Sequence, residues 1–365
     1  MKQGWEIKKL GDICCKKQQI ARAVKTYSPS DSIVYIDISA IDSSTNEITE
    51  PTTMLLKDAP SRAQQVVEKN DILVSLVRPN LKNIALICDD RNNLVASSGF
   101  CILRTKENPR FLKYIVIGEP FTNYLISRTS GANYPAVRED DVKRYSIPIP
   151  PLTEQEKIVA ELDCLFGIIE KKKQQLKEYD ALAQSIFYEM FGNPIDNEKG
   201  WEVKVFKNCY KLTSGKNLTA KKIVMGDYPV YGGNGIVGYH NDYNLDGDNI
   251  IIGRVGALCG NVRNVLGKAY ITDNAFILTK LEEGINIFIL YLLKIHNLRQ
   301  YARDALQPVI SNAGFQNIEI ILPPLSLQQE FASKIEAIEK QKELIKQSLA
   351  ETETLFNSRM DFYFN

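Results

Sequence analysis

Two glycine-rich segments have the residue types of a nucleotide site, but neither has the surroundings that such a site needs. Residues Gly233 to Gly238 have the spacing G-x-G-x-x-G, which holds a dinucleotide only where a helix begins. The residues that follow, YHNDYNLDGDN, favour turns rather than a helix. Gly267-Lys268 resembles the end of a phosphate-binding loop, but Gly260 is two residues too far away and Ala269 replaces the magnesium-binding Ser or Thr. We therefore expect a glycine-rich hairpin loop and no nucleotide site.

Two Glu-x-Lys triplets have the spacing found in many nucleases. They are Glu6-Ile7-Lys8 and Glu202-Val203-Lys204, and neither follows an aspartate placed to bind a metal ion. Both are expected to open an edge strand instead. The two histidines are too few for most metal chemistry, and the sequence has no nucleophile elbow. The sequence therefore predicts no catalytic residue, no metal ligand and no cofactor-binding residue in this chain.

The remaining candidates are polar side chains in loops at the ends of predicted strands. Arg, Lys, Asn and Ser in such loops bind phosphates and the edges of bases, although each one taken alone is better explained as a solvated turn residue. They occur twice, in places that correspond, and as a set they favour nucleic acid. The candidates are Arg78, Asn80, Lys82, Ser97, Ser98, Asn133 and Tyr134 in the first part of the chain, and Tyr231, Gly233, Asn234, Tyr239, Arg254, Thr272, Asn274 and Gln307 in the second.

A long helix is predicted behind the first set of loops. Apolar side chains alternate at steps of four and three from Ile158 to Met190, and only Lys172 interrupts them. Thr153, which follows Pro150-Pro151, is the expected N-cap. A helix of about 39 residues would be about 58 Å long. It needs a partner helix, because a rod of that length cannot bury its apolar seam against itself.

Residues 324–365 supply that partner. The same seam recurs from Phe331 to Tyr363, with polar residues at Lys342, Thr352 and Arg359. The alternative of two unrelated surface helices does not explain why both begin behind Pro-Pro-Leu. We therefore expect an antiparallel coiled coil within the chain.

The globular parts are predicted to be two copies of one unit. Pro150-Pro151-Leu152 and Pro323-Pro324-Leu325 are 173 residues apart, and Gly4-Trp5-Glu6 returns as Gly200-Trp201-Glu202. DILVSLVR likewise resembles NIIIGRVG, and each copy alternates short apolar strands with turns. The expected fold is mixed α/β with pseudo-twofold symmetry. Its parts are a globular domain at 1–150, a helix at 151–193, a second domain at 194–323 and a second helix at 324–365.

Composition indicates a protein of the cytoplasm, and the charge permits an anionic partner without requiring one. Residues 1–150 contain 21 Lys and Arg against 17 Asp and Glu, and residues 194–323 contain 14 against 12. The helical stretches are acidic, so the small positive excess lies on the globular parts. The seven cysteines have no C-x-x-C spacing and are expected to be reduced. No stretch is apolar enough to span a membrane, and no signal peptide is visible.

The whole pattern resembles the specificity (S) subunit of type I restriction–modification systems. The resemblance covers the whole chain and depends on the helix entries PIPPLTEQEKI and LPPLSLQQEF, and on the runs YIDIS…DILVSLVRPNLK…SSGF and YPVYGGNGIVGY…IIIGRVGALCGNV…ITDNAFIL. It implies that each globular part is a target-recognition domain for one half of a split, double-stranded DNA site. It also implies that the helices form a spacer between them.

The resemblance further implies which partners and cofactors to expect. The helices would dock two methyltransferase (M) subunits, which use S-adenosylmethionine, and restriction (R) subunits with ATP and magnesium would join them. Candidate partner-binding residues are Gln155 and Gln328 at the helix entries, and Leu344 and Leu355, which lie off the seam. Two alternatives stay open at this point. The chain could serve a type IIB-like or methylation-only system, or it could be a coiled-coil scaffold that does not bind DNA.

Overall fold

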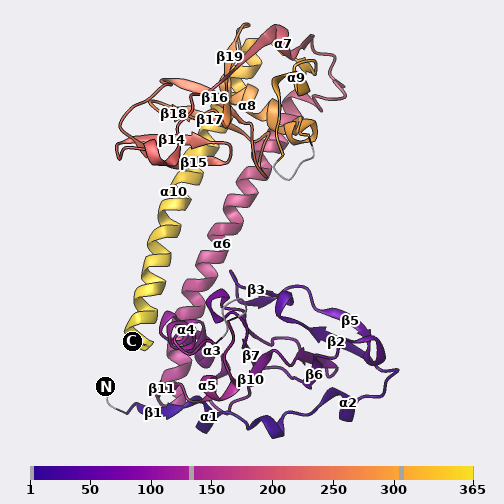
Figure 1. Ribbon diagram of the computed structural model, residues 1–365, viewed down its shortest axis with the longest axis vertical. Coiled ribbons are helices and arrows are strands. Elements are labelled where there is room, and N and C mark those ends of the chain that lie inside the picture. The colour runs from indigo at the N-terminus through magenta and orange to yellow at the C-terminus, as the bar shows by residue number, and fades with distance from the viewer. Residues whose placement is uncertain (1–3, 131–134, 304–307, 365) are drawn as a thin grey trace. The chain divides into compact units, whose positions relative to one another are not determined.

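The computed structural model describes residues 4–130, 135–303 and 308–364, and these residues divide into two compact units. The first unit contains residues up to Lys171 together with Leu349 onwards, and the second contains Lys172–Ser348. The two long helices are α6 (Leu152–Phe191) and α10 (Leu325–Phe364), each of 40 residues (Figure 1). Both expected helices are thus confirmed. The boundaries between the units fall inside both of them.

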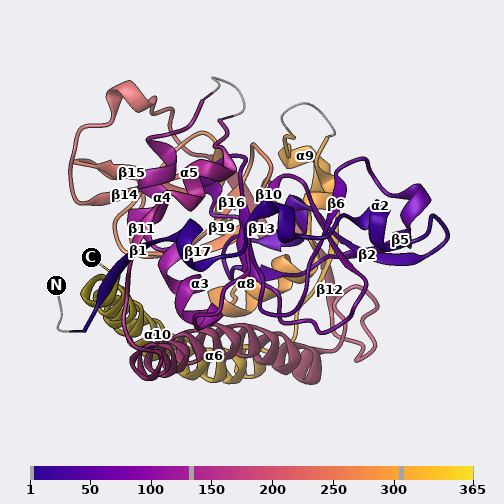
Figure 2. The same ribbon diagram turned by 90° about the horizontal axis from the view of Figure 1, so that it is seen from below.

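The first unit contains the globular part that precedes α6. Strands β1 (Glu6–Lys9) and β11 (Ser146–Ile149) pair antiparallel and lie side by side in Figure 2. One sheet has the order β5-β2-β9-β6 and another the order β10-β7-β8, and a hairpin joins β3 to β4. The bounds are β2 (Ser32–Ile36), β3 (Ile41–Asp42), β4 (Glu47–Ile48), β5 (Thr52–Leu55), β6 (Ala63–Val66), β7 (Ile72–Ser75), β8 (Ile84–Leu86), β9 (Leu94–Ser97), β10 (Phe100–Leu103), α1 (Leu10–Ile13), α2 (Ala23–Thr26), α3 (Pro109–Ile117), α4 (Glu119–Ile126) and α5 (Glu139–Lys143).

The second unit repeats this plan. Strands β12 (Val203–Val205) and β20 (Glu319–Ile321) pair as β1 and β11 do, and the order β19-β16-β17 repeats β10-β7-β8 with β13 added at its edge. A third sheet has the order β15-β14-β18. The bounds are β13 (Tyr210–Ser214), β14 (Tyr228–Gly232), β15 (Gly235–His240), β16 (Asp248–Gly253), β17 (Val262–Leu266), β18 (Tyr270–Ile271), β19 (Ala275–Lys280), α7 (Phe206–Cys209), α8 (Asn286–Ile295) and α9 (Asn312–Phe315). The predicted mixed α/β repeat is confirmed.

Both edge-strand predictions hold for the Glu-x-Lys triplets. Glu6 and Lys8 lie on β1, and Lys204 lies on β12. The N-cap prediction is wrong, because α6 begins at Leu152 and Thr153 lies inside its first turn. The carbonyl of Pro151 accepts the backbone N–H groups of Glu154 and Gln155 instead. The Pro151 carbonyl therefore accepts hydrogen bonds from the first turn of α6, where the sequence predicted the Thr153 hydroxyl as the cap.

Within each unit the two long helices contact each other, and the contacts run in opposite directions along the chain. In the first unit Arg359 pairs with Glu161, and the rings of Phe356 and Phe166 lie 6.4 Å apart. In the second unit the rings of Phe331 and Phe187 lie 5.5 Å apart. Higher residue numbers on α10 thus meet lower numbers on α6. These local contacts are antiparallel, and the coiled coil with its pseudo-twofold symmetry stays a prediction.

The end of each helix closes the hydrophobic core of the unit in which it lies. In the second unit the end of α6 supplies Phe191, whose ring is 4.8 Å from that of Phe288 on α8. In the first unit the end of α10 supplies Phe364, whose ring is 5.5 Å from that of Phe111 on α3. Phe191 and Phe364 are 173 residues apart, so the repeat extends to the cores.

Candidate nucleic-acid interface

Each unit has the same short turn between its sheet strands, built around a buried hydroxyl. In the first unit the Ser97 hydroxyl accepts the backbone N–H of Gly99 at 3.3 Å, and in the second the Thr272 hydroxyl accepts the N–H of Asn274 at 3.4 Å. Thr272 also donates to the carbonyl of Tyr231. Ser97 is fully buried and Thr272 is 3% exposed. Their prediction as DNA-binding residues is therefore corrected: they shape the turn, because buried hydroxyls that serve the backbone cannot also contact a duplex.

A cavity of about 520 Å³ lies beside this turn in the first unit. We name it the Arg78 cavity. The guanidinium-bearing residues Arg62 and Arg78 line it together with Asn83 and Ser39, and apolar side chains complete it. Arg78 adopts the left-handed backbone conformation, and its N–H donates to the carbonyl of Pro135 at 2.7 Å. A cationic cavity at strand ends is a suitable place to bind an anion or a base edge.

The other candidates of the first unit differ in how accessible they are. Asn80 and Ser98 are exposed. Lys82 forms an ion pair with Glu119, and its carbonyl accepts the side-chain amide of Asn46. Lys82 therefore holds α4 against the loop and is partly neutralised. Asn133 and Tyr134 lie outside the described residues, as does Gln307 of the second set.

The corresponding place in the second unit holds a cavity of about 300 Å³. We name it the Asn274 cavity. Its polar lining consists of Asn234, Asn274, Thr272 and the backbone of Gly232, Gly233 and Gly256, and of the described residues that line it none carries a charge. The structure thus brings together Gly233, Asn234, Thr272 and Asn274, all of which the sequence had singled out. Carboxamides can both donate and accept, so this cavity suits a neutral hydrogen-bonding edge.

The predicted glycine-rich hairpin is confirmed and forms one wall of the Asn274 cavity. Gly233 and Asn234 make the turn between β14 and β15 (Figure 1). A Cβ atom added to Gly233 would lie 2.3 Å from the carbonyl oxygen of Val255, and one added to Gly253 would lie 2.2 Å from the carbonyl oxygen of Gly233. Only glycine permits this close approach of the hairpin to the end of β16.

The aromatic and cationic candidates of the second unit lie around the cavity rather than in it. Tyr239 is exposed on β15, whereas Tyr231 is half-buried on β14. The guanidinium of Arg254 lies 5.3 Å from the ring of Phe276, and its Nε is buried without a hydrogen bond among the described residues. Arg254 thus stacks on the sheet and contacts Ser214 and the Asp273 carbonyl at 3.5 Å.

Several cationic residues near these cavities were missed by the sequence analysis. Arg62 lies sixteen residues before Arg78 and joins it only through the fold. In the second unit Lys216, Lys221 and Lys222 are exposed on the loop that also contributes Leu218 and Ile223 to the Asn274 cavity. The run GKNLTAKK directly after β13 was the available signal, since three lysines in seven residues of a loop favour contact with phosphates.

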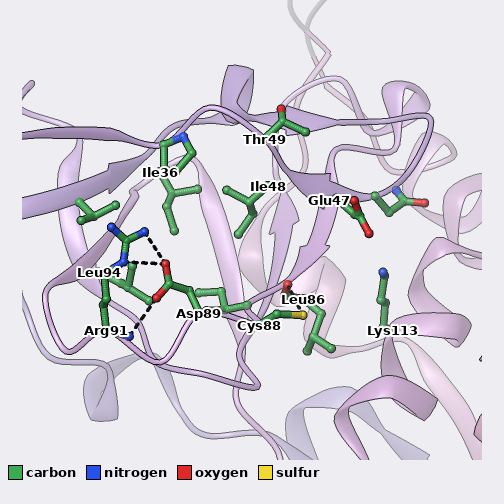
Figure 3. A pocket seen from close by; sticks show the side chains of 14 residues that line it. Ile36, Glu47, Ile48, Thr49, Leu86, Cys88, Asp89, Arg91, Leu94 and Lys113 are labelled. Carbon is green, nitrogen blue, oxygen red and sulfur yellow. Dashed lines mark hydrogen bonds and ion pairs between the residues drawn. The ribbon is translucent and has the colours of Figure 1, made fainter.

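A further cavity of about 430 Å³ lies elsewhere in the first unit, between the β3–β4 hairpin, the loop after β8 and α3 (Figure 3). Lys113 and Glu47 line it without an ion pair between them among the described residues, and Arg91 pairs with Asp89 at its other side. Burial lowers the pKa of Lys113. No local pattern of residues predicts this cavity, because its walls come from four separate segments.

The glutamines proposed as partner-binding residues have a different role. Gln155 is fully buried and Gln328 is 2% exposed. The Gln155 amide donates to the carbonyl of Pro150 and accepts the N–H of Asn108, while Gln328 donates to Pro323 and accepts the N–H of Ile285. Both predictions are corrected, since a buried amide with these bonds joins each long helix to the segment before α3 or α8. Leu344 and Leu355 are half-exposed, as expected.

Among the described residues, no group of His, Cys, Asp and Glu is placed to hold a metal ion. None of the helices searched in the described ranges is both long and apolar enough to cross a membrane. The seven cysteines are free thiols.

Comparison with known proteins assigns both repeats to one family. The family model described as "Type I restriction modification DNA specificity domain" matches residues 2–178 and again residues 198–354. The EcoprrI type I restriction enzyme specificity subunit of Escherichia coli is 29% identical over 216 residues, which are 55% of this chain and 54% of that protein. The chain spans about half the length, or less, of the first curated relatives that it matches.

Two solved structures have the same fold. A chain from a study of complex assembly and conformational transition in the type I R-M system is 26% identical, with a TM-score of 0.60, and the match covers 99% of this chain and 97% of that one. The S subunit from M. genitalium is 16% identical with a TM-score of 0.58, over 100% and 98% of the two chains, and shows the fold alone. The chain therefore belongs to the family of type I restriction–modification DNA specificity domains, and it contains two copies of that domain.

Proposed function

We propose that this chain is the DNA sequence-recognition subunit of a type I restriction–modification enzyme. Each globular part reads one half of a bipartite, gapped target in double-stranded DNA. The observation that carries the proposal is the repeated cavity beside the strand-end turn, which is lined by two guanidinium groups in one unit and, in the other, by carboxamides with no charged side chain among the described lining residues. Two readers with the same scaffold and different side chains fit a target whose two halves differ in sequence.

In this proposal catalysis belongs to the partner subunits. Two methyltransferase subunits would bind S-adenosylmethionine and the target adenine, and restriction subunits would use ATP and magnesium. The chain's own residues bind and orient the duplex. Helix α10 offers a docking surface, since its Leu344 and Leu355 present apolar side chains that are 52% and 49% exposed.

The direct test is to express the chain with and without its methyltransferase partner in a host lacking other adenine methylation. Methylome sequencing should then show one gapped motif, present only when both proteins are made. A gel-shift assay of the purified complex should favour that motif over random duplex at moderate salt. Absence of both methylation and sequence-selective binding would reject the proposal. Restriction of unmodified phage in the same host separates a full system from a methylation-only one.

The docking surface is tested by the double variant Leu344→Asp, Leu355→Asp. We expect it to keep its melting temperature and to lose co-purification with the methyltransferase, because the exposed leucines contribute to binding and not to the core. The matched control is Gln347→Asp, which adds an acid at another exposed place on α10. Unchanged co-purification of the leucine variant would place the docking surface elsewhere.

A further inference from the structure

The two cavities share one wall of the repeat, because Val77 and Arg78 line the first and their equivalents Val255 and Gly256 line the second. Ile72 on β7 pairs with Leu103, and Ile250 on β16 pairs with Leu278, so the strands of the two sheets can be superposed in register. This register makes Arg78 equivalent to Gly256, and Gly99 equivalent to Asn274. Two hydrogen bonds confirm it: Leu76 donates to the Gly99 carbonyl at 2.9 Å, and Arg254 donates to the Asn274 carbonyl at 2.8 Å.

The loops beside the two cavities make corresponding backbone contacts. Val77 bridges to Ala136 and Val255 bridges to Val309. The N–H of Arg78 donates to the Pro135 carbonyl, and the N–H of Gly256 donates to the Pro308 carbonyl at 2.9 Å. The backbones therefore match, and the side chains at the cavity are exchanged. In the first unit Arg78 lies opposite Gly99. In the second unit the equivalent residues are Gly256 and Asn274.

From this exchange we infer that the two domains recognise different purines at the corresponding position of their half-sites: Arg78 of the first domain binds a guanine and Asn274 of the second binds an adenine. The inference rests on the proposed function and names its specificity-determining residues. A guanidinium donates two parallel hydrogen bonds to O6 and N7 of guanine, whereas a carboxamide accepts from N6 and donates to N7 of adenine. Neither side chain can make the other's pair of bonds.

The surroundings of each side chain support the assignment. Asn274 is exposed, and its carboxamide has no hydrogen bond among the described residues. Gly256 has a φ of +99° and no side chain, so the second unit has no guanidinium at the place equivalent to Arg78, and the Asn234 carboxamide lies beside it. A Cβ atom at Gly99 would lie 2.9 Å from the terminal methyl group of Ile38, so an asparagine there would need the Ile38 side chain to shift. Each cavity thus presents a different side chain at the matched strand ends: Arg78 in the first unit and Asn274 in the second.

The experiment is methylome sequencing of the complex with single substitutions. We expect Arg78→Ala to relax one position of one half-site, where wild type requires guanine, by about tenfold or more in preference. Asn274→Ala should relax one position of the other half-site, where wild type requires adenine. Arg78→Lys keeps the charge and loses the two-pronged geometry, so it should relax the same guanine while keeping the salt dependence of binding. Melting temperatures confirm that each variant folds.

Arg62→Ala is the matched control, since it removes a guanidinium from the same cavity. It should weaken binding to all sequences alike. The inference is overturned if Arg78→Ala weakens binding uniformly with no relaxed position, if Arg62→Ala relaxes the guanine instead, or if either relaxed base is of the other kind. A wild-type complex that methylates a gapped motif while these variants fail to alter it rejects this inference and leaves the proposed function intact.

Discussion

Gln155 and Gln328 are the residues that join each long helix to the globular part of its unit. Each amide satisfies a buried proline carbonyl five residues earlier and a backbone N–H that precedes α3 or α8. Gln155 also donates to the carboxylate of Glu107. Buried polar groups that lose such partners are costly, so these two side chains fix the angle at which the helix leaves the domain.

We predict that Gln155→Met destabilises the first unit and Gln328→Met the second, each by at least about 2 kcal/mol. The physical reason is that each substitution leaves a half-buried N–H and a buried carbonyl without a partner. Hydrogen exchange resolved by segment would show which unit opens. The control is Gln174→Met, an exposed glutamine on α6 that should change stability little. Equal effects at all three positions would contradict the role assigned to the buried pair.

His296 makes the stability of the second unit depend on pH. Burial lowers the pKa of His296, and its Nε2 atom has no hydrogen-bond partner among the described residues. The folded protein therefore binds this proton less readily than the unfolded chain. The resulting stabilisation is fully present above the unfolded pKa of about 6.5 and is lost as the pH falls below it.

We expect the second unit to lose stability between pH 7 and pH 5, and the variant His296→Leu to lose less over the same range. Chemical denaturation at several pH values measures this, with wild type and variant compared at constant ionic strength. Parallel stability curves for wild type and His296→Leu would refute the assignment.

The candidate site could be predicted only in part from sequence, and the reason is visible at single residues. Asn234 and Asn274 could be predicted because both are polar residues next to predicted strand ends, and the fold brings those ends together at one cavity. Ser97 and Thr272 were misread, because the same polarity also serves a buried turn and only the tertiary structure distinguishes the two uses. Arg62 was missed, since no local pattern shows that it reaches Arg78.

At the scale of elements, the polar residues that interrupt the helix seam make contacts between the helices. In the second unit the Lys172 ammonium donates to the carbonyl and hydroxyl of Ser348, both at 2.8 Å, and Lys342 pairs with Asp180. In the first unit Arg359 pairs with Glu161, which also accepts the Tyr363 hydroxyl. These pairs lower the pKa of Glu161. Polar seam residues of this kind fix the register of paired helices.

The helices themselves were predictable because a sustained four-three pattern behind Pro-Pro has few other solutions. The side chains that are buried near the helix ends were less predictable. Phe187 and Phe191 are fully buried, although the seam pointed to Ile186 and Met190. The helix there packs against α8 as well as against α10, and its buried face widens accordingly. A heptad pattern describes contact with a helix and cannot anticipate contact with a domain.

We predict that Phe331→Ala destabilises the second unit by about 3–5 kcal/mol. Phe331 is fully buried, and its ring lies within 5.5 Å of those of Phe187, Phe191 and Tyr291. Leu344→Ala on the same helix should change stability by about 0.5 kcal/mol or less, because that side chain is half-exposed. Thermal unfolding compares the two. A small effect of Phe331→Ala would mean that the helix contributes little to this core.

At the scale of the whole molecule, each unit is built from residues distant in sequence. The first unit needs the end of α10, and the second needs the end of α6. Both 40-residue helices, each about 60 Å long, contribute residues to both units. If the helices determine the gap between the two half-sites, then lengthening them must lengthen the gap.

We predict that inserting four residues after Lys173 and four after Lys346 lengthens the methylated gap and leaves both half-sites unchanged. The two insertions lie between the same two contacts, Lys172 with Ser348 and Asp180 with Lys342. They therefore lengthen both helices at the same height along the pair. Four residues add about 6 Å and rotate the helix about 40° beyond a full turn. Six ångströms correspond to nearly two base pairs at about 3.4 Å each.

The expected gap is therefore one or two base pairs longer, with some loss of affinity because the rotation of the duplex is not matched exactly by that of the helix. Two residues inserted at the same places should abolish methylation, since they turn the apolar seam away from its partner. Methylome sequencing of the insertion strains measures both outcomes. An active four-residue variant that keeps the original gap would show that the domains are placed by the methyltransferase and the DNA, with the helices serving as docking surfaces alone.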